Sequence, residues 1–470
     1  MNAARRAASV AVVLGVVLVG CGSGSLHGRS ATNSSGVVAL SSGPVASSPA
    51  SASAPASAAP TSAPASATHT SAPASAPVSA AALASYRWSA LPPAPIAVRT
   101  GAASAWTGQQ LLIWGGALGP QGDQLASDGA AYDPATKRWT KLPTAPISAR
   151  DQMASVWTGS ELFIWGGDAS DGISANGALY NPTTMKWRKL PAGPLSGRTG
   201  AQAVWVDGEV IVIGGDPPAL SSSQQVLTDL AAFNPTTNKW TALAPMPLVA
   251  NQLVLAIVPV ATNDRLYAWE EWQHDVENAD GSGTIYSGID LYIFDPASNT
   301  WTPDVAASRP TAGVGDNNSP VGIASAIWTG TNILVPPPTS DWCGDCPGPA
   351  LLGGRADLLN PRTNTWTMLP AGPIDDFNPG VFVWTGSLVI DFNTSAERNG
   401  PDGKSTLPGQ AAAWDPRTGI WTRLPAAPLY GGDVAEWDGD GLLVWGLLST
   451  PSANGSDTST TIGMQFGPSP

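Results

Sequence analysis

A short motif that recurs six times constrains the fold of this chain more than any other feature. The motif is an apolar residue followed by Asp-Pro or Asn-Pro, with a tryptophan seven residues after the apolar residue. Because a turn lies inside this fixed distance, each copy predicts a strand, a proline-containing turn and a returning strand. A repeat of this length indicates stacked supersecondary units rather than one irregular core. The copies begin at Tyr132, Tyr180, Phe233, Phe294, Leu359 and Trp414.

A second hairpin is predicted upstream of each motif. Its first strand ends in a turn such as Trp106-Thr107-Gly108, and its second strand is apolar, as at residues 111–114. In the first three repeats two glycines follow this second strand, at 115–116, 166–167 and 214–215. Four short strands per repeat with turn signals between them are typical of a β-propeller blade.

The paired glycines, and the aromatic residue seven positions before the tryptophan, resemble the kelch-repeat β-propellers, in the superfamily that includes galactose oxidase. The resemblance covers residues 86–470 and implies an all-β fold. The upstream hairpin occurs seven times, whereas the Asp/Asn-Pro unit occurs six times. An isolated Trp-x-x-Leu-Pro segment begins at Trp88, and a third strand is expected at residues 461–466. We therefore predict a seven-bladed propeller whose last blade is closed by the N-terminal strand, which removes exposed sheet edges.

The first 21 residues are predicted to be a lipoprotein signal peptide. Arg5 and Arg6 precede an apolar run at 10–19 that is short for a membrane span. The tetrad at 18–21 resembles the bacterial lipobox, which implies lipidation of Cys21. The expected location is the cell membrane, with the protein lipid-anchored and facing outside the cytoplasm. A plain cleaved signal or an uncleaved anchor is the alternative.

Composition defines two further regions and excludes one class of partner. Residues 22–85 are mostly Ala, Ser, Pro and Thr, so they cannot bury enough apolar surface to fold and are predicted to be a disordered linker. The propeller is assigned to residues 86–470. The formal net charge is −13, with only 22 basic residues. Because no basic run could replace phosphate counterions, a nucleic-acid partner is not expected.

Two cysteines remain after Cys21. In an exported protein, Cys343 and Cys346 are predicted to form a disulfide that closes a tight loop. A redox-active pair is an alternative, but it would need a helix N-terminus to lower the thiol pKa. A zinc site would need a second pair of ligands.

The candidate ligand-binding residues include two tryptophans that do not follow the repeat. Trp272 lies close in sequence to Glu270 and His274, and Trp342 precedes Cys343. Both tryptophans are expected in long loops, of the fourth and fifth repeats. An exposed indole beside carboxylates is typical of a sugar-binding site. The alternative is a loop held in place by its own aromatic residue and disulfide.

Three arginines form a second set of candidates. Arg99, Arg150 and Arg198 each lie four residues after a proline, at the entry to a first strand. Gathered near one mouth of the central channel, they could hold a carboxylate group of a ligand, as arginines do in sialidase-like propellers. The alternative is a structural role in which each arginine ties neighbouring blades together.

Binding is favoured over catalysis. Galactose oxidase holds copper through two histidines and two tyrosines, but His274 is the one histidine in the predicted propeller, so copper chemistry is not expected. No other metal or cofactor is expected either. We predict a monomeric, membrane-anchored binding or scaffolding module for a glycan or a protein. The alternative is a carbohydrate-active lyase, hydrolase or sialic-acid mutarotase that uses Glu270, His274 and an arginine.

Overall fold

The structure is a computed structural model of the whole chain. It describes residues 78–118, 124–218, 226–277, 283–304, 326–335, 356–370, 372–374, 381–392, 397–398, 405–406, 410–427, 430–431, 434–450, 458–461 and 463–468. The chain divides into two compact units, Met1–Val16 with Ser71–Pro470, and Val17–Thr70. All described residues belong to the first unit.

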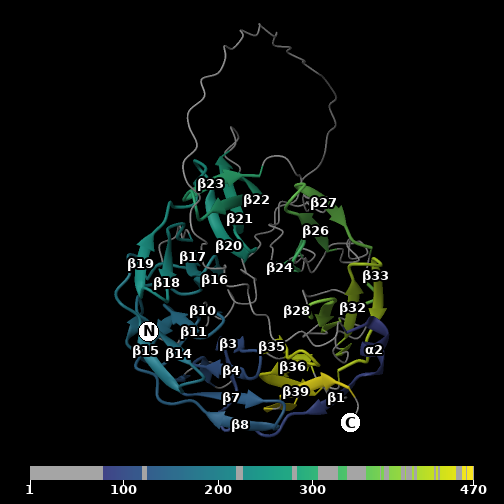
Figure 1. Cartoon of the computed structure of the whole chain (residues 1–470). Coiled ribbons are helices and arrows are strands. Elements are labelled where there is room, and N and C mark those ends of the chain that lie inside the picture. The colour runs from purple at the N-terminus through teal and green to yellow at the C-terminus, as the bar shows by residue number, and fades with distance from the viewer. Residues whose placement is uncertain are drawn as a thin grey trace, which may run out of the picture. The chain divides into compact units, whose positions relative to one another are not determined.

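The described residues form seven antiparallel four-stranded sheets, numbered here in chain order (Figure 1). Sheets 1 to 3 contain β3 (Ala103–Trp106), β4 (Leu111–Trp114), β7 (Gly129–Asp133), β8 (Arg138–Lys141); β10 (Ala154–Trp157), β11 (Leu162–Trp165), β14 (Gly177–Asn181), β15 (Lys186–Lys189); β16 (Gln202–Val206), β17 (Glu209–Ile213), β18 (Leu230–Asn234) and β19 (Lys239–Ala242). Sheets 4 and 5 contain β20 (Leu253–Ala261), β21 (Leu266–Glu277), β22 (Gly283–Asp295), β23 (Thr300–Pro303); β24 (Ile327–Trp328), β25 (Ile333–Val335), β26 (Asp357–Asn360) and β27 (Thr365–Met368). Sheets 6 and 7 contain β28 (Val381–Trp384), β29 (Val389–Phe392), β32 (Ala411–Asp415), β33 (Ile420–Arg423); β35 (Val434–Trp437), β36 (Leu442–Trp445), β39 (Met464–Gly467) and β1 (Arg87–Ala90).

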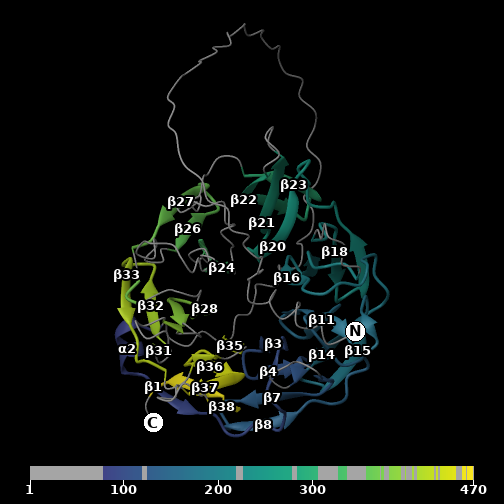
Figure 2. The same cartoon turned by 180° about the vertical axis from the view of Figure 1, so that it is seen from behind.

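The first strands of the sheets lie innermost, as the two opposite views agree (Figure 2). Each first strand contacts the first strand of the next sheet, and β35 of sheet 7 contacts β3 of sheet 1. The core is divided accordingly, because one apolar cluster of described residues lies between each pair of neighbouring sheets. Second strands such as β4 are covered on both faces and therefore read as continuous apolar runs.

Sheet 7 contains strands from both ends of the folded region. β1 pairs antiparallel with β39, so that Trp88 lies opposite Phe466. The rings of these two residues are 5.1 Å apart, and Trp88 also lies 5.3 Å from Phe392 of sheet 6. The N-terminal strand is thus packed against two sheets that are formed by the last third of the chain.

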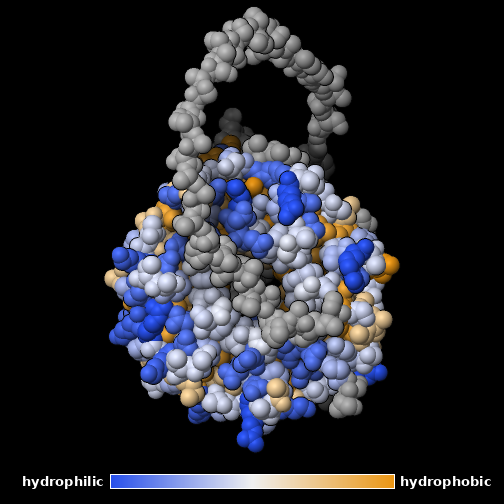
Figure 3. Space-filling model, in the orientation of Figure 1, coloured by the Kyte–Doolittle hydropathy of each residue, from blue (hydrophilic) through white to orange (hydrophobic). Residues whose placement is uncertain are grey.

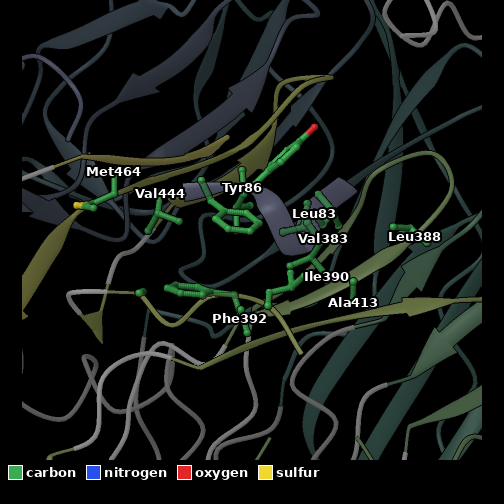
Figure 4. Packing of buried hydrophobic residues seen from close by; sticks show 14 residues of the cluster. Leu83, Tyr86, Val383, Leu388, Ile390, Phe392, Ala413, Val444 and Met464 are labelled. Atoms are coloured by element: carbon green, nitrogen blue, oxygen red, sulfur yellow. The ribbon is translucent and has the colours of Figure 1, made fainter. Parts of the chain in front are cut away.

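The folded region begins earlier than residue 86. Residues 80–85, which were predicted to belong to the disordered linker, form the helix α2 (Ala80–Ser85), capped by the Ser79 hydroxyl. Leu83 is fully buried, and it packs with Tyr86, Val383 and Ile390 between sheets 6 and 7 (Figure 4). The prediction failed because a single leucine in an Ala/Ser-rich stretch gives no periodic apolar signal.

In six of the seven sheets, the described residues show the repeated tryptophan of the fourth strand bonded to the segment that follows the preceding sheet. The indole N–H of Trp240 in sheet 3, for example, donates to the carbonyl of Pro191, which follows the last strand of sheet 2, at 3.1 Å. Trp88 makes the same bond to Pro425 at 3.0 Å. The other members of this set are Trp139, Trp187, Trp301 and Trp421, which donate to the carbonyls of Pro92, Pro143, Ala244 and Pro370.

Small accessory sheets fill the segments between second and third strands in part of the chain. They contain β2 (Arg99–Thr100), β5 (Ala117–Leu118), β6 (Gln124–Leu125); β9 (Arg150–Asp151), β12 (Asp168–Ala169), β13 (Gly172–Ile173); β30 (Glu397–Arg398), β31 (Ser405–Thr406); β34 (Tyr430–Gly431), β37 (Leu447–Thr450) and β38 (Thr458–Thr461). Sheet 4 has no accessory sheet among the described residues, because its own second and third strands continue instead.

Candidate functional site

The second strand of sheet 4 continues where the second strands of sheets 1 to 3 stop. Leu266 lies opposite Phe294 as Val210 lies opposite Phe233 in sheet 3, so Glu270 takes the place of Gly214. Gly214 and Gly215 have φ angles of 75° and 91°, which non-glycine residues rarely adopt, and they end the strand. With two glutamates in their place, β21 and β22 extend to 12 and 13 residues.

The extended part of this hairpin carries two carboxylates in register. Glu270 and Asp290 are directly opposite each other on β21 and β22. Their face is turned towards sheet 3, because Leu266 and Ala268, four and two positions before Glu270, pack in one cluster with Ile211. Glu270 is fully buried. Its two carboxylate oxygens accept no hydrogen bond of good geometry from the described residues.

The surroundings of Glu270 favour its protonated, uncharged form. Burial, and after it the charge of Asp290, raises the pKa of Glu270 to about 7, although the nearby Tyr292 hydroxyl opposes this shift. Burial also raises the pKa of Asp290, and the nearby indole of Trp272 opposes this. The pKa of Tyr292 rises to about 12 because of burial and the two acids. The pair can therefore hold a proton that an exposed pair would release.

The predicted loop position of Trp272 was wrong. Trp272 lies within β21, opposite Gly288, and its side chain is half-buried. A Cβ atom on Gly288 would come within 2.5 Å of the indole Cζ2, so the ring lies directly against the backbone of β22. His274, two positions on, lies on the same face and is also half-buried. Trp342, Cys343, Cys346 and Cys21 lie outside the described residues, so their predicted roles stay predictions.

The three arginines lie inside the sheets and not at an open surface. Arg99, Arg150 and Arg198 have at most 1% of their surface exposed. In sheet 3, Arg198 donates to both carboxylate oxygens of Asp229, at 2.8 and 3.0 Å, and to the carbonyl of Gly214. This arrangement corrects their assignment as ligand-binding residues, because their hydrogen-bond donors are already used within the fold.

The same contacts recur in the first two sheets. Arg99 donates to Asp128 at 2.8 Å, and Arg150 donates to the side-chain oxygen of Asn176 at 2.8 Å. Each arginine also donates to the carbonyl of the first glycine of the pair. In sheets 1 to 3 the double glycine and the arginine therefore act together. The glycines end the second strand, and the arginine donates to the carbonyl of the first glycine.

Sheet 4 has an acid at the position of Asp229, but it has no arginine at the position of Arg198. Asp290 lies four residues before Phe294, as Asp229 lies four residues before Phe233. Thr199 is bridged to Asp216 in sheet 3 as Val254 is paired with Trp272 in sheet 4, so the residue of sheet 4 that corresponds to Arg198 is Leu253. Residues 243–264 contain no lysine or arginine. Asp290 of sheet 4 thus stands where sheets 1 and 3 hold an acid that is neutralised by an arginine.

Replacing Glu270 by glutamine should stabilise the protein above about pH 4.5, by an amount that grows up to about pH 7. The pKa is raised from 4.5 to about 7 on folding. Between these values the folded state holds a proton that the unfolded state has lost, so the free energy of unfolding falls as pH rises, by on the order of 3 kcal/mol in total. Denaturant midpoints of Glu270→Gln and the parent should coincide near about pH 4.5 and diverge up to about pH 7.

Glu271→Gln is the control for this comparison, because it removes a charge from the same strand but from the opposite face. If Glu271→Gln stabilised the protein at about pH 8 as much as Glu270→Gln, a general charge effect would explain the result. The pH dependence of stability that comes from Glu436 is the same in all three proteins, so it cancels when their midpoints are compared.

Glu436 is a second acid with a raised pKa, on a half-buried side chain, that sequence patterns did not reveal. It is the one charged residue on the described first strands of the seven sheets. Val434 lies opposite Trp445 as Ala103 lies opposite Trp114, so Glu436 takes the position of the buried Ala105. Burial raises its pKa to about 7. Comparing equivalent positions of the seven first strands could have identified this glutamate in the sequence.

The described residues contain neither a metal-binding cluster of side chains nor a membrane-spanning helix. No group of three or more His, Cys, Asp or Glu side chains in this part of the chain is placed to hold a metal ion. No helix that the structure describes is long and apolar enough to cross a membrane.

Comparison with known families bears on the repeats. Residues 72–269 match the model of the KLHDC2/KLHL20/DRC7 Kelch-repeats domain. This range includes α2, β1 and all of sheets 1 to 3, and it ends within β21. No curated protein matches the chain. Residues 72–269 are thus similar to kelch repeats, and the antiparallel four-stranded sheets of the described residues are of the kind found in β-propellers.

Proposed function

We propose that this protein is a membrane-anchored, extracytoplasmic kelch propeller that binds and scaffolds a protein partner. Kelch repeats generally serve as protein-binding scaffolds. The observation that carries the proposal is the long hairpin of sheet 4, in which β21 and β22 continue beyond their pairing with β20 and β23. Segments that depart from a repeat in this way are the parts of a scaffold that most often carry function.

A protein partner is favoured over a glycan at this hairpin. Sugar stacking needs an open indole face, but the ring of Trp272 lies against the backbone at Gly288. Its Nε1 atom is also buried. The three arginines that could have held an acidic sugar are buried within the sheets. The groups of the hairpin that remain available to a ligand are backbone N–H and C=O groups and acidic side chains, and these suit a polypeptide ligand.

The carboxylate pair does not favour the alternative of a carbohydrate-active enzyme. Glu270 and Asp290 lie opposite each other, an arrangement that could in principle flank a glycosidic bond. Glu270 has 0% of its surface exposed, however, so a substrate has no access to its carboxyl group. The pair is therefore better explained as part of the architecture of the hairpin.

We also propose that the seven sheets are the blades of one propeller, closed by the N-terminal strand. The pairing of β1 with β39 and the contact between β35 and β3 support this closure. This closure pairs the edge of β39, which would otherwise be open to association with another sheet.

The proposed anchor is the lipidated Cys21, with residues 22–77 as the spacer and a disulfide between Cys343 and Cys346. The expected result is that a radiolabelled fatty acid is incorporated into the full chain and not into a Cys21→Ala variant, which should leave the membrane fraction. Equal labelling of both proteins would contradict lipidation at this residue.

Protein binding can be tested by photocrosslinking from defined positions in the full chain, in the cells that make it. A photoreactive amino acid at position 274 probes the extended end of the hairpin, and one at the exposed position 298 probes the opposite end of β22. We expect a discrete protein adduct from position 274 and none from position 298. No adduct, or the same adducts from both positions, would contradict the proposal.

A further inference from the structure

One edge of β22 has no partner strand among the described residues along most of its length. β22 pairs with β21 from Gly283 to Phe294, but it pairs with β23 only from Tyr292 to Asp295. One further bond, from the amide of Asp304 to the carbonyl of Leu291 at 2.8 Å, closes that short ladder. Residues 283–290 thus form an edge that begins where sheet 4 departs from the repeat.

The direction of the free backbone groups follows from this last bond. In an antiparallel strand the N–H and C=O groups of one residue point to the same side, and the side alternates along the strand. Since the carbonyl of Leu291 points towards β23, the groups of residues 289, 287, 285 and 283 point to the same, unpaired side. These groups can accept a further antiparallel strand without any change in β21.

The charge of the hairpin selects the kind of strand that could bind. β21 and β22 contain no lysine or arginine; besides the buried Glu270 they contain the acids Glu271, Asp275, Glu277, Asp290 and Asp295, of which Asp295 lies 3.4 Å from Arg265. Figure 3 shows hydrophilic residues over the region where Figure 1 places these strands. In sheets 1 and 3 the acid equivalent to Asp290 is neutralised by an arginine of the chain itself, whereas sheet 4 supplies none.

We propose that residues 283–290 of β22 bind an extended, lysine- or arginine-rich segment of the partner protein as an added strand. Backbone hydrogen bonds supply the affinity, and the basic side chains compensate the acidic hairpin. The inference rests on the proposed protein-binding function and names the chemistry of the partner. A second copy of this chain is disfavoured because two acidic hairpins would repel. The chain's own linker is disfavoured because residues 22–77 contain one basic residue, Arg29.

The test uses the full chain and a synthetic peptide in which lysine alternates with valine or threonine. Two control peptides carry glutamate in place of lysine, or methyl groups on alternate backbone nitrogens. The protein variant is Ser287→Pro, because proline at an outward-pointing edge position removes a donor for an added strand but none used by β21. Ser287→Ala is the matched variant, and thermal midpoints verify that both variants fold.

We expect the lysine peptide to bind the parent and Ser287→Ala, and to bind Ser287→Pro at least about tenfold more weakly, a loss of about 1.4 kcal/mol. Neither control peptide should bind. Absence of binding to the parent, equal binding of the glutamate peptide, or equal binding to Ser287→Pro would overturn strand addition. Persistence of the crosslink from position 274 in Ser287→Pro would also overturn it, while leaving the protein-binding function intact.

Discussion

Removing residues 86–92 is expected to destabilise the whole set of sheets, not only its N-terminal end. β1 is the outer strand of sheet 7, and Trp88 packs against Phe392 and Phe466 and donates to the carbonyl of Pro425. The deletion exposes the edge of β39 and the cluster between sheets 6 and 7. We expect a loss on the order of 5 kcal/mol, comparable with the total stability of a typical domain, measured as a large fall in the thermal midpoint.

The point variant Trp88→Ala removes the main contacts of β1 without shortening the chain, so it tests those contacts separately from the deletion. Trp240 makes the equivalent bond in sheet 3, to Pro191. If β1 is a true fourth strand, Trp88→Ala and Trp240→Ala should each cost about 2–4 kcal/mol, the range for truncating a large aromatic residue that is partly buried. A chain that lacks only residues 22–77 should melt like the parent. A Trp88→Ala midpoint equal to that of the parent would contradict a closing role for this strand.

Arg198→Met is expected to be strongly destabilising even though methionine preserves most of the apolar stem. The guanidinium of Arg198 is fully buried and donates to Asp229, to Gly214 and to Ser196. Its removal leaves the carbonyls of Gly214 and Ser196 without this donor, at about 1–3 kcal/mol for each buried acceptor left unsatisfied, whereas the half-exposed Asp229 can be hydrated instead. The measurement is the denaturant midpoint, with the exposed Arg138→Met as the control, for which we expect a change below about 0.5 kcal/mol.

This variant also separates the two roles considered for the arginines. A structural role predicts loss of stability with Arg198→Met. A ligand-binding role predicts a protein of unchanged stability that no longer binds. The second outcome would contradict the buried contacts described above.

The repeat signals in the sequence predicted the four-stranded sheets well, for a local reason. The turn at Asp/Asn-Pro, the tryptophan seven residues after the preceding apolar residue and the double glycine each act within about ten residues, so each copy carries its own instructions. The isolated Trp-x-x-Leu-Pro segment at Trp88 was a further local signal, since it was a fourth strand without a third. The helix at 80–85 escaped detection because tertiary packing of Leu83, and not periodicity, stabilises it.

The candidate site depended on the register of a long hairpin, which the sequence could not supply. Glu270 and Asp290 are 20 residues apart, and they become neighbours only because the turn between β21 and β22 sets the pairing. A shift of one residue would place Asp290 on the other face, since side chains alternate along a strand. For the same reason, the adjacent acids Glu270 and Glu271 lie on opposite faces of β21.

The amino-acid sequence by itself determined the repeating unit of this protein, its all-β class and the strand at residues 87–90 that lacks a local partner. The tertiary structure alone decided that Glu270 is buried opposite Asp290, that the arginines of sheets 1 to 3 are bonded within the fold, and that residues 283–290 of β22 have one edge without a partner strand among the described residues. The physical reason is that turns and caps are encoded over a few residues, whereas burial and cross-strand pairing depend on which distant segments meet.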